Sequence, residues 1–80
     1  MYEATLQIYG KTFKGEGESI FAALQSVNPG IAKGKSVLTL KQGEKEMVRV
    51  LSGMQTAKLF HPNPKIKEIG VKQIAARFDV

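Results

Sequence analysis

The chain has 80 residues, 42% of them hydrophobic and 24% charged, with twelve lysines and arginines against seven acidic residues for a net charge of +5. This composition excludes a disordered chain, and the length allows a single domain over residues 1–80 with one thin core. No apolar run reaches the roughly 18 residues that cross a bilayer, and the first residues lack the basic and apolar segments of a secretory signal.

The residue types also limit the chemistry. One histidine and no cysteine are too few for the usual structural zinc sites, so we expect no metal and no cofactor. A chain this short has little room for an enclosed pocket, so we expect neither an enzyme nor a small-molecule substrate. Small extracellular domains are usually held together by disulfides, so the lack of cysteine predicts a reducing, cytoplasmic location.

The N-terminal residues predict a β-hairpin. Apolar and polar residues alternate strictly from Tyr2 to Tyr9, which is typical of a strand with one buried face. Gly10-Lys11 is the expected turn, because glycine reaches the positive φ that hairpin turns need. The returning strand over residues 12–14 is weakened by Gly15 and Gly17.

A helix is expected next. Ser19 can accept hydrogen bonds from the exposed amides of the first turn, and apolar residues follow at helical spacing: Ile20, Phe21, Leu24 and Val27. Asn28-Pro29-Gly30 ends this helix, because proline cannot continue it.

Residues 30–36 read GIAKGKS, and the final Gly-Lys-Ser is how a phosphate-binding loop ends. Such a loop needs four residues between its glycines and leads from a strand into a helix. Here only three residues separate Gly30 from Gly34, and the segment leads from a helix into a strand. We therefore expect these glycines to serve backbone geometry and not phosphate binding.

Residues 36–41 and 45–51 are rich in β-forming residues and flank Gly43, which predicts a second hairpin. Ser52 can cap a second helix over residues 54–60, which the two prolines of His61-Pro62-Asn63-Pro64 end. A lone histidine in such a segment is typical of a loop residue bonded to local backbone.

Residues 66–80 allow two interpretations. Ile66, Ile69, Ile74 and Phe78 could form a helical stripe, which Gly70 would weaken. The same segment alternates toward Val80 as a strand would, and we favour the strand. The predicted order is β-β-α-β-β-α-β, with β-β-α-β-β-α as the alternative. Both describe an α+β domain with helices on one face of a mostly antiparallel sheet.

Five basic residues lie in or beside the second hairpin: Lys33, Lys35, Lys41, Lys45 and Arg49. Whether they form a patch depends on register, because a shift of one residue moves every side chain to the other face. If Leu38 shares the buried face with Val48, all but Lys33 point outward. If the turn is Gln42-Gly43, the basic residues divide between the two faces.

Two functions follow as hypotheses. The first is a non-enzymatic protein-interaction module that self-associates, as a homo-oligomer, through a sheet face or edge carrying Tyr9, Val37, Met47 and Leu51. The second is a non-specific nucleic-acid-binding protein that uses the five basic residues, with Tyr9 stacking on a base. We place self-association first, because an excess of lysine is common among proteins that never bind nucleic acid.

Overall fold

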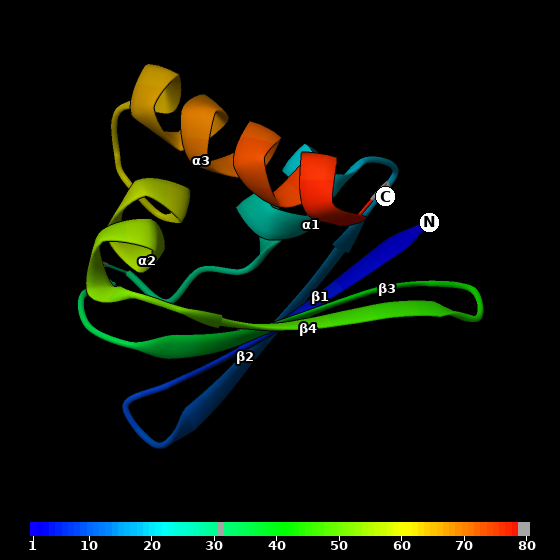
Figure 1. Cartoon of the computed structure of the whole chain (residues 1–80), viewed down its shortest axis with the longest axis horizontal. Helices are drawn as coiled ribbons and strands as arrows, with labels where there is room; N and C mark the ends of the chain where they lie inside the picture. The colour runs from blue at the N-terminus through cyan, green and yellow to red at the C-terminus, as the bar shows by residue number, and fades with distance from the viewer. Residues whose placement is uncertain (31, 79–80) are drawn as a thin grey trace.

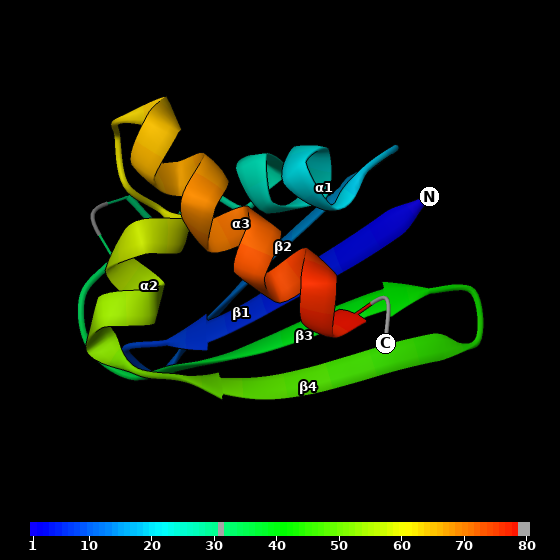
Figure 2. The ribbon, with the colours of Figure 1, turned by 45° about the horizontal axis from the view of Figure 1, so that its top comes forward.

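The computed structural model describes residues 1–30 and 32–78 as a four-stranded antiparallel sheet and three helices. The elements are β1 (Tyr2–Ile8), β2 (Lys11–Gly17), α1 (Ile20–Ser26), β3 (Ser36–Gln42), β4 (Lys45–Leu51), α2 (Gly53–Leu59) and α3 (Pro64–Phe78). All three helices lie on one side of the sheet (Figure 1), and α3 crosses that side (Figure 2). The predicted α+β class and the order of the first six elements are confirmed.

The sheet has the strand order β2-β1-β3-β4, so β1 and β3 are central. The alternation predicted for β1 is confirmed, since Ala4, Leu6 and Ile8 are only 1%, 0% and 3% exposed. They join the helices in one hydrophobic core that includes Leu24 and Phe78. Within residues 1–30 and 32–78, no helix is long and apolar enough to cross a membrane.

The first hairpin turns one residue earlier than expected. Ile8 pairs with Lys11, so the turn residues are Tyr9 and Gly10, at φ of 57° and 69°. Positive φ at both turn positions matches the twist of the two strands, which explains why this turn replaces Gly10-Lys11.

Gly15 and Gly17 permit a close contact, which the sequence alone did not indicate. A Cβ atom on Gly15 would lie 2.6 Å from the Val27 backbone nitrogen, and one on Gly17 would lie 2.6 Å from the Ala22 Cβ. Because any side chain here would collide with α1, the two glycines allow α1 to lie directly on β2.

Both predicted helix caps are present. The Ser19 hydroxyl accepts a hydrogen bond from the Ala22 amide at 3.0 Å. At α2, Ser52 Oγ accepts from the Gln55 amide at 3.2 Å, while the Ser52 amide donates to Gln55 Oε1 at 3.0 Å. This reciprocal pair is a capping box, which satisfies two backbone donors at once.

The last described element is a helix, so the strand that we favoured over residues 66–80 is wrong for residues 66–78. The core residues Val71, Ile74 and Phe78 recur at helical spacing along α3. Gly70 does not interrupt the helix but is the point of its contact with α2, where a Cβ would lie 3.2 Å from the Leu59 nitrogen. Packing on α2 thus compensates for the low helix propensity of glycine. Residues 79 and 80 lie outside the described residues.

The GIAKGKS segment connects α1 to β3, as expected, and Gly30 and Gly34 have positive φ of 76° and 95°. Its last residue, Ser36, is 3% exposed and lies 2.7 Å from the Thr56 hydroxyl. A serine committed to the core in this way is not available to a phosphate, so the segment serves backbone geometry.

Candidate functional site: the outer sheet face and the edge strand β4

The residue pairs of the second hairpin differ from those of both registers considered, but its basic residues divide between the two faces as expected for a Gln42-Gly43 turn. Gln42 pairs with Lys45, which leaves Gly43 and Glu44 as a two-residue turn with φ of 61° at Gly43. Leu38 therefore lies opposite Arg49. Opposed residues point to the same face of an antiparallel sheet, so Arg49 shares the helix-covered face with the buried Leu38.

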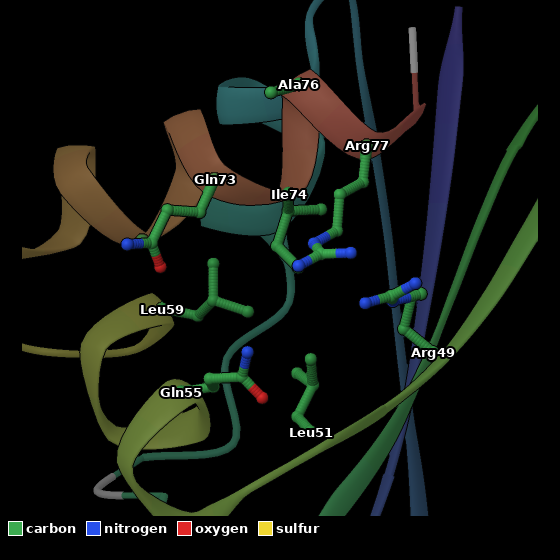
Figure 3. Close-up of a pocket in the computed structure, with 9 residues that line it drawn as sticks. Arg49, Leu51, Gln55, Leu59, Gln73, Ile74, Ala76 and Arg77 are labelled. Carbon is green, nitrogen blue, oxygen red and sulfur yellow. The ribbon is translucent and has the colours of Figure 1, made fainter. Parts of the chain in front are cut away.

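This register divides the five basic residues among three places. Lys41 is on the outer face, opposite Glu46. Lys45 and Arg49 are on the helix-covered face: Lys45 Nζ lies 4.7 Å from the centre of the Phe78 ring, and Arg49 lines a cavity between β4, α2 and α3 (Figure 3). Lys33 and Lys35 are exposed in the loop before β3. The single basic sheet face that the nucleic-acid hypothesis requires is not formed.

Tyr9 has a structural contact of its own. Its hydroxyl donates to the Lys33 carbonyl oxygen at 2.6 Å and accepts from the Lys33 amide at 2.6 Å. The side chain is 57% exposed, but its polar end ties the β1–β2 turn to the loop before β3. Tyr9 therefore lies at one end of the sheet and not among the apolar residues of its outer face.

The residues predicted for an interface also need correction. Val37 is on the outer face as expected, but Met47 and Leu51 point toward the helices, and Leu51 is only 1% exposed. Their places on the outer face are taken by Val48 and Val50, which are 56% and 72% exposed. The signal that could have identified these valines is a two-residue turn at Gly43, because a turn of either Gln42-Gly43 or Gly43-Glu44 puts Val48 and Val50 on the outer face.

The outer face grades from polar to apolar across the sheet. The pairings place its residues in three rows that run from β2 to β4: Thr12–Gln7–Val37–Val50, Lys14–Thr5–Thr39–Val48 and Glu16–Glu3–Lys41–Glu46. The apolar end of the first two rows is on β4. The third row holds three carboxylates and one lysine, so this face as a whole does not favour a polyanion.

Strand β4 is an edge of the sheet, and no described residue pairs with its outer side. The residues that flank a two-residue turn form a hydrogen-bonded pair, and such pairs alternate along the ladder. It follows that Lys45, Met47, Arg49 and Leu51 bond to β3. Glu46, Val48 and Val50 then direct their backbone N–H and C=O groups away from the sheet, where they can pair with another strand.

Comparisons with protein-family models, curated proteins and solved structures gave no match to this chain. Within the described residues, no group of three or more His, Cys, Asp or Glu side chains could hold a metal ion. His61 Nδ1 accepts from the Asn63 amide at 3.0 Å, which confirms the local backbone bond expected of this histidine.

Proposed function

We propose that this protein is a small, non-enzymatic interaction module that self-associates by antiparallel pairing of β4 with β4 of a second copy. The observation that supports this most directly is the combination of a seven-residue edge strand with two exposed valines on its uncovered face. Backbone pairing would satisfy the outward N–H and C=O groups, and the valines would leave water at the same time.

The charges on β4 select one register for this pairing. Outward-directed backbone groups must face each other, so Val48 can lie opposite Glu46, Val48 or Val50 of the second copy. With Glu46 opposite Val48, Lys45 faces Arg49. With Val50 opposite Val48, Arg49 faces Arg49. Only the register centred on Val48 avoids opposing like charges, which destabilise a strand pair.

The favoured register also pairs the whole strand. Val48 faces Val48, Val50 faces Glu46, and Met47 faces Arg49 across a two-fold axis perpendicular to the sheet. The two outer faces then join into one eight-stranded surface with the four valines of β4 at its centre. Because the contact consists of one strand pair and a few side chains, we expect a weak, concentration-dependent dimer.

Analytical ultracentrifugation over a range of concentrations tests this proposal. The variant V48K places a charge at the centre of the contact and should remain monomeric where the wild type dimerises. The matched control is T12K, which puts the same charge on the outer face of the opposite edge strand, β2. A wild type that is monomeric at high micromolar concentration would contradict the proposal, and so would equal effects of the two variants.

Non-specific nucleic-acid binding is the alternative function, and its premise was a single basic sheet face. Lysines interspersed with Glu3, Glu16 and Glu46 on the outer face give it little support. Retention of the protein on immobilised single-stranded DNA at low salt, lost steeply as salt rises, would favour this alternative. A cytoplasmic location is part of the proposal in either case, since the chain contains no cysteine to stabilise it outside the cell.

A further inference from the structure

A cavity of about 570 Å³ lies on the opposite side of β4 from the exposed valines, between this strand and helices α2 and α3. Figure 3 shows side chains from all three elements directed into it. Its volume is within the roughly 300–1,000 Å³ typical of sites for small molecules. The cavity belongs to a single copy of the chain and does not depend on the proposed dimer.

Both arginines of the sequence line this cavity, although every other basic residue is a lysine. Arg49 comes from the middle of β4, where its backbone is fixed opposite the fully buried Leu38. Arg77 comes from the last turn of α3, next to Phe78, which is 2% exposed. Figure 3 shows the two guanidinium groups extending toward each other across the cavity. Strand β4 and helix α3 thus each bring a planar guanidinium group, with five N–H donors, to the same cavity.

Gln55 adds a third donor whose orientation is set by the fold. Its Oε1 accepts from the Ser52 amide in the capping box, at 3.0 Å. This bond directs the Nε2 group away from the helix end, and Figure 3 shows that group facing the cavity. Gln73 lines the same space from α3 and can donate or accept.

The remaining surface of the cavity is apolar. Leu51, Leu59 and Ile74 line it, and they are 1%, 1% and 4% exposed. Arg49 is half-buried beside this apolar wall, so its contact with a negative charge is stronger than in open water, whereas a contact of the exposed Arg77 is screened by water. Among residues 1–30 and 32–78, the cavity lining contains two positive charges and no carboxylate. Its chemistry therefore favours a ligand with a compact negative group and a non-polar body.

We infer that this cavity binds a small organic phosphate monoester, with the phosphate held by Arg49 and Arg77 and the organic part against Leu59 and Ile74. A phosphate monoester carries about −1.5 to −2 charge at pH 7, which matches two guanidinium groups better than a carboxylate does. Arginine also forms bidentate hydrogen bonds to phosphate, which lysine does not. The phosphate has acceptor oxygens to spare for the Gln55 amide.

NMR titration with phenyl phosphate tests this inference, with benzoate and inorganic phosphate as separate arms. The probe should shift the side-chain Nε–Hε signals of Arg49 and Arg77 and the Gln55 amide signals, in a saturable way. Phenyl phosphate should bind more tightly than inorganic phosphate, which lacks the apolar part, and more tightly than benzoate, which carries a single charge.

The variants R49Q and R77Q should each weaken phenyl phosphate binding at least about tenfold, as expected for a lost charge-assisted contact. Arg77 is exposed, so R77Q tests the site even if R49Q perturbs the strand. K41Q, which removes one charge from the outer face of the same hairpin, is the matched control and should bind as the wild type does.

The dimer variant V48K should bind phenyl phosphate as tightly as the wild type does. A failed dimer proposal and a failed cavity inference can therefore be told apart. The inference is overturned if no saturable shift occurs at either arginine. It is also overturned if K41Q weakens binding as much as R77Q, because the probe would then respond only to net charge.

Discussion

The side-chain oxygens of Ser36 and Thr56 lie 2.7 Å apart in the core and join the first residue of β3 to helix α2. Thr56 is 0% exposed, and its hydroxyl proton is donated to the Ser52 carbonyl oxygen at 2.9 Å. Ser36 is therefore the donor to Thr56. The chain of three oxygens holds the start of α2 against the sheet.

Replacing Thr56 with valine should destabilise the protein by about 1–3 kcal/mol, because the buried Ser36 hydroxyl then has no acceptor. The double variant S36A/T56V should recover part of this loss, since both partners become apolar. Urea unfolding of the two single variants and the double variant measures the coupling. Strictly additive losses would contradict the hydrogen-bonded chain described above.

Replacing Gly15 with alanine should destabilise the protein by about 1–3 kcal/mol, because the added Cβ would collide with the α1 backbone. The control is K14A, an exposed position on the outer face of the same strand, where we expect a change within about 0.5 kcal/mol. Thermal or urea unfolding compares the two. Similar small effects would show that α1 does not lie directly on β2.

Replacing Gly70 with alanine separates two effects on stability that have opposite signs, helix propensity and helix packing. Alanine in an exposed helix would be more stable than glycine by about 1 kcal/mol. Here the added Cβ would lie 3.2 Å from backbone atoms of Leu59 and Lys58, so we expect G70A to lower the free energy of unfolding. A gain in stability, measured by urea unfolding, would mean that α2 and α3 pack less closely than described.

Lys67 should make the free energy of unfolding depend on pH in the alkaline range. Burial lowers the pKa of its ammonium below the ordinary value of 10.5, although the Phe21 ring centre lies 5.9 Å away and favours the charge. Between the folded-state pKa and 10.5, the unfolded chain binds more protons, so this residue's contribution to stability rises with pH. We expect K67M to be more stable than the wild type at pH 7, with the difference shrinking toward pH 10.5.

The control for this pH dependence is K65M, which removes the charge of an exposed lysine at the start of the same helix. Unfolding in urea at several pH values between 7 and 10.5 gives the required free energies. A difference between K67M and the wild type that stays constant over this range would contradict the lowered pKa of this partly buried ammonium.

Several elements could be predicted because their causes are local. The alternation of Tyr2–Ile8 identifies a half-buried strand, and Ser19 and Ser52 mark helix starts by the hydrogen bonds that their own side chains make. The final helix could not be separated from a strand, because its glycine is explained by contact with α2 and its apolar stripe by contact with the common core. The candidate interface was misplaced for a related reason: a slip of one residue exchanges Met47 and Leu51 for Val48 and Val50.

From the amino-acid sequence by itself, one could establish a small, cysteine-free α+β domain with two hairpins and two capped helices, because period, turn and cap signals act over a few residues. Only the tertiary structure decided which face Arg49 occupies, that it lines one cavity with Arg77, and that Val48 and Val50 are left exposed on an edge. Those relationships depend on strand register and helix packing, which are set by contacts between residues far apart in the chain.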